Sequence, residues 1–387
     1  MKSLSQRTKL QESGIRRMYD LAKTKQDVIS FVLGEPDFTT PQHIIQAAKN
    51  ALDQGLTHYT DNAGILPLRK AIANYLERQD GITYDPVGEI MVSTGAMEII
   101  FLCFSALLDP GDEVLITDPC YANYYGQISM NNGVPVPVPV YEDNGFHFTY
   151  ESLKAHVTPK TKAILLNSPC NPTGGVADLA TMESIARIAR EYDLYVVYDA
   201  VYRHFTYEGS RFYNLAALTG MRERTLYVDS FSKTYAMTGW RLGYAAGPRE
   251  IISLLPKLHE FMPSCVPEFL QLGAAEALEH GEGDIAAMHR EYSKRRAILL
   301  DRINGIHGLS CRAPGGAFYA FLNIQQTGLS SVEFAERLLS EQGVVVAPGD
   351  AFGAHGEGFI RISYATSIAN IQKGMDRMEA FVGALLS

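Results

Sequence analysis

Short apolar runs alternate with helical patterns through the middle of this 387-residue chain, and that alternation restricts the fold more than any other feature. The runs are rich in Val, Ile, Leu or Tyr and are bounded by Gly, Pro, Asp or Asn. Alternation of this kind is typical of a mainly parallel sheet with helices on both faces. The sequence therefore predicts an α/β fold with a helix at 96–107 and strands at 89–93, 113–117, 162–166, 194–198, 226–228 and 243–246.

The C-terminal part has a different pattern. Strands are predicted at 318–322 and 359–363, and a long helix at 285–303 leads into this part. Apolar residues recur at helical spacing in a final helix, at Ile368, Ile371, Met375, Met378, Val382 and Leu385. Residues 1–44 have no sheet pattern, so we expect an N-terminal arm that forms part of a small domain. We predict a large domain at 45–290 and a smaller α+β domain at 291–387.

The composition excludes several classes of protein. The formal net charge of −9 argues against nucleic-acid binding. The five cysteines are widely spaced and form no CxxC pair, which favours reduced thiols in the cytoplasm over disulfides or a metal site. The polar N-terminus has no secretory signal pattern, and the longest near-apolar run, 99–108, is too short for a bilayer. We expect a cytoplasmic protein without a membrane or nucleic-acid partner.

Polar residues follow three of the predicted strands: Asn171, Asp199 and Lys233. Ligands collect at the carboxyl ends of parallel strands. Asn171 lies in Asn-Pro-Thr-Gly, which favours a turn, although its amide is also suited to a phenolate oxygen. Asp199 is either the cap of a following helix or a carboxylate opposite a pyridine nitrogen, whose protonation it would favour. In the second case Tyr202 is placed to bond a ring hydroxyl.

Lys233 lies in the segment 230–243, SFSKTYAMTGWRLG, among small hydroxyl residues. A lysine in a buried polar pocket loses part of its charge and becomes a nucleophile toward aldehydes. Ser230, Ser232 and Arg241 supply the donors and the positive charge that a phosphate monoester needs. The segment therefore favours pyridoxal phosphate as a ligand, and the alternative is a surface loop with an ordinary lysine.

Three further segments have both a structural and a functional interpretation. At 93–98 a strand passes through a glycine into a helix, which is either an ordinary turn or an anion site at a helix N-terminus. Tyr121 is either a core residue or a ring that stacks on a planar ligand. Arg361 has apolar neighbours, which suggests burial, and a buried arginine is normally paired with a carboxylate, either in a structural salt bridge or on a substrate.

The motifs GxGxxG, GxxxxGK[ST], HExxH and GxSxG are all absent, so the usual marks of dinucleotide-binding proteins and P-loop NTPases are missing.

These motifs, in this order, resemble the class I/II aminotransferases, the fold-type I pyridoxal-phosphate enzymes of the aspartate aminotransferase superfamily. The resemblance covers nearly the whole chain: 33–37, 58–60 with Gly64, 68–69, 93–98, 171–174, 199–202, 230–243 and Arg361. It implies a large domain with a mainly parallel seven-stranded sheet between helices, a smaller α+β domain built from both termini, and a homodimer with shared active sites.

The resemblance also implies a role for each residue. Lys233 condenses with the aldehyde of pyridoxal 5'-phosphate and later moves the substrate α-proton, while Asp199 pairs with the pyridine nitrogen. The remaining contacts to the cofactor are expected from Asn171 and Tyr202 at the ring hydroxyl, Tyr121 on the ring face, and Gly95, Ala96, Met97, Ser230, Ser232 and Arg241 at the phosphate, with Tyr59 reaching that phosphate from the neighbouring subunit. Arg361 is expected to bind the substrate carboxylate, together with Gly34 and Asn171.

The sequence departs from the family pattern in three places. Ala200 stands where many relatives have Glu, although Asp199 is kept. Met97 stands where an aspartate-using subgroup carries a lysine for the distal carboxylate, which weakens an aspartate-specific interpretation. Cys120 replaces a commoner aromatic neighbour of Tyr121.

We therefore expect an aminotransferase that moves the α-amino group of an aromatic or large neutral L-amino acid to a 2-oxo acid such as 2-oxoglutarate. Ile15, Tyr19 and Phe31 are candidates for the side-chain pocket or for packing. Aspartate, alanine and a diaminopimelate-type substrate stay open, as does β-elimination on the same cofactor. A non-catalytic regulator and a dinucleotide-dependent oxidoreductase are further alternatives, and both lack their usual sequence marks.

Overall fold

The computed structural model describes residues 14–23 and 25–387. Its centre is a seven-stranded sheet in the order β2-β8-β7-β6-β5-β3-β4, in which β8 is antiparallel to both of its neighbours and the other pairs are parallel. The strands are β2 Ile90–Ser93, β3 Glu113–Asp118, β4 Val134–Pro139, β5 Thr161–Asn167, β6 Tyr195–Asp199, β7 Thr225–Ser230 and β8 Gly243–Ala246. The predicted α/β fold is confirmed.

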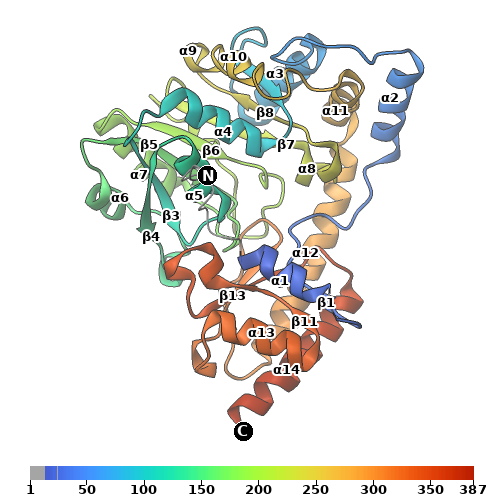
Figure 1. Cartoon of the computed structure of the whole chain (residues 1–387), viewed down its shortest axis with the longest axis vertical. Coiled ribbons are helices and arrows are strands. Elements are labelled where there is room, and N and C mark those ends of the chain that lie inside the picture. The colour runs from blue at the N-terminus through green and yellow to red at the C-terminus, as the bar shows by residue number, and fades with distance from the viewer. Residues whose placement is uncertain (1–13, 24) are drawn as a thin grey trace, which may run out of the picture.

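Both faces of this sheet are covered by helices. Successive residues of a strand point to opposite sides of the sheet, so each strand contributes side chains to both faces. In β6, Val196 and Tyr198 join one apolar cluster and Val197 joins the other. Helices surround the sheet in Figure 1. The helices are α1 Gly14–Ala22, α2 Gln42–Asp53, α3 Leu66–Asp80, α4 Ala96–Leu107, α5 Asn123–Met130, α6 Tyr150–His156, α7 Leu179–Glu191, α8 Phe231–Thr234, α9 Arg249–Ile252, α10 Leu255–His259, α11 Glu268–His280, α12 Glu282–Asn304, α13 Ser331–Gln342 and α14 Ile368–Leu386.

Strand β4 was not expected from the sequence, because its residues alternate valine with proline. Proline has no backbone N–H, so it disrupts a central strand but is tolerated at a sheet edge. β4 is the last strand in the sheet order and pairs only with β3. The backbone N–H groups of Val134 and Val140 donate to the Asp112 and Asp118 carbonyls. The backbone nitrogens of the even-numbered residues therefore face β3, and those of the prolines face outward.

The C-terminal part forms a separate four-stranded sheet in the order β12-β13-β10-β9. Its strands are β9 Ser310–Cys311, β10 Tyr319–Asn323, β12 Ala347–Pro348 and β13 Phe359–Ser363. The N-terminal β1 (Ile29–Ser30) pairs in parallel with β11 (Val344–Val345) beside it. Helix α12 runs from the large sheet to this part in Figure 1. The predicted boundary at residue 290 lies inside α12, and the division into domains stays a prediction.

Within the described part of the chain, no helix is long and apolar enough to cross a membrane. The same residues contain no group of His, Cys, Asp and Glu side chains that is arranged to hold a metal ion. All five cysteines are free, and Cys103, Cys120 and Cys170 are buried.

Candidate active site

A cavity of about 630 Å³ opens where β5, β6 and β7 end, between the large sheet and the C-terminal part. Its lining includes residues from both of those parts, and from α1. Of the predicted site residues, twelve line this cavity: Gly34, Ala96, Met97, Tyr121, Asn171, Asp199, Tyr202, Ser230, Ser232, Lys233, Arg241 and Arg361. The structure therefore brings together residues that lie far apart in the sequence, as expected for ligands at the carboxyl ends of parallel strands.

Lys233 reaches the cavity from α8, a single short turn that begins where β7 ends. The Ser230 hydroxyl accepts a hydrogen bond from the Ser232 N–H at 3.1 Å and so fixes the start of this turn. The Lys233 ammonium donates to the Gly34 carbonyl at 2.6 Å. Burial lowers the pKa of Lys233 to about 8, against the opposing effect of Glu35. The side chain is a buried amine, and the surface-loop alternative is wrong.

Asp199 is the last residue of β6 and is buried. Its Oδ2 accepts from the Tyr124 hydroxyl at 2.7 Å and its Oδ1 from the Val201 N–H at 3.2 Å. Burial raises the pKa of Asp199 to about 6, although the Tyr124 hydrogen bond opposes the rise. The segment after Asp199 is a turn, so the helix that Asp199 was considered to cap is absent. Asp199 is instead a buried carboxylate with an oxygen at the cavity.

Arg361 is the central residue of β13 and is 2% exposed. Its Nη1 donates to Oδ1 of Asn171 at 2.9 Å, and its Nη2 donates to the Val32 carbonyl. Its Nε is buried without a hydrogen-bond partner, and no carboxylate in the described residues forms a salt bridge with it. The structural salt bridge considered from the sequence is therefore absent, and a buried guanidinium in this state favours an incoming carboxylate.

A second positively charged part of the cavity lies at the N-terminus of α4, beside Arg241. No side chain caps this helix, and its first residues Ala96 and Met97 line the cavity. Arg241 packs over Gly95, where an added Cβ would lie 2.8 Å from Nη2. Gly95 has φ +103°, which other residues rarely adopt, so both its backbone and its missing side chain make room for the guanidinium. Uncapped helix N–H groups beside an arginine form an anion site.

Aromatic residues form the walls between these parts of the cavity. Tyr121 lines the cavity, and its ring meets Tyr124 edge-on with centroids 5.4 Å apart. The Tyr202 and Tyr319 hydroxyls are hydrogen-bonded at 2.8 Å, and both side chains are buried. Ile15 and Tyr19 of α1 also line the cavity. Phe31 does not: it is 1% exposed and packs in the apolar core.

Two predicted residues do not line the cavity of this chain. Gly95 shapes it indirectly through Arg241. Tyr59 is 91% exposed and lies outside the cavity lining. An exposed tyrosine agrees with a contact to another subunit, which is the role expected for Tyr59.

Sequence reasoning missed three residues that complete the site. Tyr124 bonds Asp199, and Tyr319 bonds Tyr202. Asn167, at the end of β5, donates to the Asp199 carbonyl at 3.1 Å and accepts from the Asn171 N–H at 2.9 Å. Asn167 directly follows the strand predicted at 162–166 and precedes Asn171, and that position was a usable signal. The two tyrosines lie in segments with no local motif.

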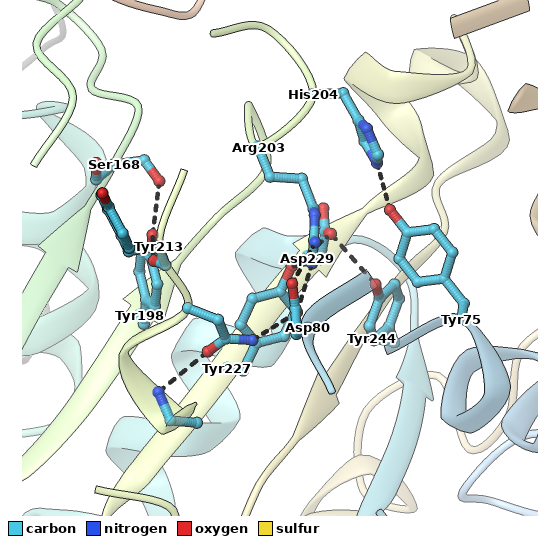
Figure 2. A network of polar contacts seen from close by, with 12 residues as sticks. Tyr75, Asp80, Ser168, Tyr198, Arg203, His204, Tyr213, Tyr227, Asp229 and Tyr244 are labelled. Atoms are coloured by element: carbon cyan, nitrogen blue, oxygen red, sulfur yellow. Dashed lines mark hydrogen bonds and ion pairs between the residues drawn. The ribbon is translucent and has the colours of Figure 1, made fainter. Parts of the chain in front are cut away.

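A buried polar network supports the site from the opposite face of the sheet (Figure 2). Asp199 is in register with Val228, so the next residue, Asp229, points to the other side. Arg203 binds Asp80 at 2.7 and 3.0 Å and donates to the Tyr227 hydroxyl at 2.7 Å. The Tyr227 hydroxyl in turn donates to Asp229 at 2.9 Å. The network joins the end of α3 to the segments that carry Tyr202 and Ser230.

Comparison with known proteins agrees with this geometry. A family profile described as aminotransferase class I and II matches residues 26–378. An aspartate aminotransferase of Pyrococcus abyssi is 48% identical over 95% of both chains, and an aromatic-amino-acid aminotransferase 2 of Thermococcus litoralis is 44% identical over 95% of both. The crystal structure of an aromatic aminotransferase from Pyrococcus horikoshii superimposes with a TM-score of 0.91 at 46% identity, covering 95% of this chain and 99% of that one. The chain therefore belongs to the class I and II aminotransferases, enzymes that transfer amino groups with pyridoxal 5'-phosphate.

Proposed function

We propose that this transaminase moves the α-amino group of an aromatic or large neutral L-amino acid to a 2-oxo acid such as 2-oxoglutarate. The observation that carries this preference is that the apolar or aromatic residues Ile15, Tyr19 and Met97 are among those that line the cavity. Burying a large apolar side chain there stabilises the complex, whereas a distal carboxylate finds no lysine at position 97. The aromatic-amino-acid aminotransferase of Thermococcus litoralis is a relative whose name agrees with this preference.

The residues of the cavity fit the cofactor of the family. The uncapped α4 N-terminus and Arg241 are suited to a phosphate dianion, while Asp199 is suited to a protonated ring nitrogen. The unpartnered Nε of Arg361 fits a substrate carboxylate. We propose that Ser230 and Ser232 complete the phosphate site, that Tyr121 stacks on the ring, and that Asn171 and Tyr202 bond the ring oxygen.

When bound, pyridoxal phosphate supplies an aldehyde and a ring that delocalises negative charge from the substrate α-carbon. Arg361 and Asn171 hold the substrate carboxylate beside Gly34 and so fix the direction of the α-hydrogen. The Nζ of Lys233 takes the α-proton as a neutral amine and returns it as an acid. Because burial lowers the pKa of Lys233 to about 8, the neutral form of this amine is far more populated near pH 7 than it is in an ordinary lysine. Asp199 keeps the ring nitrogen protonated.

We also propose a homodimer in which Tyr59 binds the phosphate of the neighbouring subunit. Tyr59 and Phe261 are 91% and 87% exposed, so both rings are free to contact a second copy of the chain. The five free cysteines support a cytoplasmic location.

Hydride reduction of the loaded protein followed by peptide mapping tests the assignment of Lys233. The label is expected on Lys233 and absent from Lys233→Ala, which should lose transamination and retain weakly bound cofactor. A label on another lysine, or substantial turnover by the variant, would refute the assignment.

A panel of L-amino acids with several 2-oxo acids tests the substrate preference. Phenylalanine, tyrosine and leucine are expected to exceed alanine and diaminopimelate as donors. Release of ammonia, pyruvate and the thiol from a cysteine conjugate without an oxo acid would instead indicate β-elimination.

Acidic substrates are a second candidate, because the cation Arg16 lies beside Ile15 and Tyr19 at the cavity. Arg16 pairs with Asp20 at 3.0 Å on the same helix, an exposed pair that a substrate carboxylate can replace. If aspartate or 2-oxoglutarate uses Arg16, Arg16→Gln lowers kcat/KM for these dicarboxylates by roughly tenfold and leaves phenylalanine unaffected. Arg17→Gln is the matched control, because Arg17 pairs with Glu336 and does not line this cavity.

A further inference from the structure

Tyr319 lines the cavity, and none of the roles above uses its hydroxyl. It is the first residue of β10 and is 1% exposed. Its hydroxyl is hydrogen-bonded to the hydroxyl of Tyr202 at 2.8 Å. Two phenols at this distance share one hydrogen, so one of them donates and the other keeps its own hydrogen for a different acceptor.

The charges around the pair decide which phenol donates. The Arg361 guanidinium lies over the Tyr319 ring, with Cζ 4.6 Å from the ring centroid. Burial raises the pKa of Tyr319 to about 12, and the positive charge of Arg361 opposes the rise. Burial also raises the pKa of Tyr202, and the negative charge of Asp199 raises it further. The position of the Arg361 charge over Tyr319 therefore favours Tyr319 as the donor and Tyr202 as the acceptor.

The missing side chain of Gly34 leaves space for the Tyr319 hydroxyl. A Cβ added to Gly34 would lie 2.2 Å from Oη of Tyr319, so only glycine leaves room for the hydroxyl at this point. The Gly34 carbonyl accepts from Lys233 at 2.6 Å. Tyr319 therefore stands between the carboxylate-binding arginine and the catalytic amine, with its hydroxyl directed at Tyr202.

We propose that Tyr319 is a positioning residue for the ring oxygen of the cofactor: its hydroxyl donates to Tyr202 and so turns the Tyr202 hydrogen toward that oxygen. The inference rests on the proposed function, in which Tyr202 bonds the ring oxygen. A hydrogen bond that is itself supported by a second donor is polarised and strengthened. The two tyrosines then act as a relay that stabilises the ring oxygen as an anion.

The test is a pH titration of the visible absorbance of the loaded protein, whose midpoint reports how strongly the ring oxygen is stabilised as an anion. Tyr319→Phe keeps the ring and removes only the hydroxyl. Because a weaker hydrogen bond disfavours the deprotonated form, the midpoint is expected to rise by about half a pH unit. Tyr202→Phe is expected to raise it further.

The double variant separates relay from packing. If Tyr319 acts through Tyr202, adding Tyr319→Phe to Tyr202→Phe leaves the midpoint of the single Tyr202 variant unchanged. Tyr207→Phe is the matched control: its buried hydroxyl donates to the Ala317 carbonyl at 2.6 Å, and it does not line the cavity. Its midpoint is expected to equal that of the wild type.

Two results overturn the inference alone: an unchanged midpoint in Tyr319→Phe, or a shift of equal size in the Tyr202→Phe background. A wild-type protein whose absorbance does not titrate, or whose hydride label lies outside Lys233, refutes the proposed function itself. The two failures are distinguishable because the first requires a wild-type protein that titrates normally.

Discussion

Asp199 is the last residue of β6 and Asp229 is the penultimate residue of the neighbouring β7; their side chains point to opposite faces of the same sheet, and both are buried. Burial raises the pKa of each to about 6. Asp199 has one tyrosine hydroxyl and one backbone N–H as partners and lines the cavity. Asp229 accepts from Tyr227, from Tyr244 at 3.2 Å and from the Ser230 N–H at 2.7 Å, and it lies outside the cavity lining.

The comparison shows that a shifted pKa does not by itself mark a functional carboxylate. Both side chains are shifted by the same cause, desolvation, and to the same extent. The two carboxylates differ in their access to a ligand. Asp199 lines the cavity, whereas both oxygens of Asp229 already accept hydrogen bonds from the protein. Asp229 lies in the strand that leads into the Lys233 turn, and Asp199 faces the cavity.

The largest expected effect is the loss of activity in Asp199→Asn. A neutral amide no longer holds a positive charge on the ring nitrogen, so kcat/KM should fall by roughly 10³-fold. Steady-state transamination with phenylalanine and 2-oxoglutarate measures the change. Asp229→Asn is the control and should stay within a few-fold of wild type; similar losses in both variants would contradict the comparison.

Asp229→Asn should instead destabilise the protein. The amide has only one acceptor oxygen. Its NH₂ group must therefore face either the tyrosine hydroxyls or the Ser230 N–H, all of which donate to the carboxylate in the wild type. An unsatisfied buried donor costs about 1–3 kcal/mol in the free energy of unfolding. Denaturant unfolding of the apoprotein measures the cost, and an unchanged midpoint would show that the network in Figure 2 does not hold the strand.

The stability difference between wild type and Asp229→Asn should depend on pH between about 4 and 6. The folded-state pKa of Asp229, about 6, is above its ordinary value of 3.8, so in this window the folded wild type binds more protons than the unfolded chain. Wild-type stability relative to the uncharged variant is therefore fully present below pH 4 and falls as pH rises, by at most about 1.4 kcal/mol per pH unit. Unfolding of both proteins at several pH values tests the sign, and a rise would refute it.

The smallest effects are expected from two matched hydroxyl deletions. Tyr124→Phe removes the hydrogen bond that orients Asp199 and should lower kcat/KM by about threefold. Tyr244→Phe removes the longer bond to Asp229 and should lower stability by about 1 kcal/mol without affecting kcat/KM. If Tyr244→Phe slowed catalysis as much as Tyr124→Phe, the two faces of the sheet would not be functionally separate.

Much of the fold was predictable because apolar alternation and boundary residues are local properties. The helix α4 and the strands β8 and β13 have the predicted bounds. The residues after β5, β6 and β7 were predictable as a site because strand ends of one sheet converge. Strand β4 was missed because its prolines favour a turn in a single sequence, and only its edge position makes them acceptable.

The unpredicted site residues depend on tertiary contacts. Tyr319 meets Tyr202 across 117 positions and Tyr124 meets Asp199 across 75, and neither lies in a motif. Phe31 was a candidate for the side-chain pocket or for packing, and it packs in the core. Which face a short irregular segment presents is decided by what it packs against, and a single sequence does not contain that information.

The outward-facing prolines of β4 have a consequence for association between molecules. An exposed strand normally offers a row of backbone donors onto which another chain can add, a route to aggregation. With prolines at the outward positions, that row is missing, and the sheet cannot be extended from this side. Addition of another chain at the β4 edge is therefore disfavoured, both in the folded protein and while the chain is still folding.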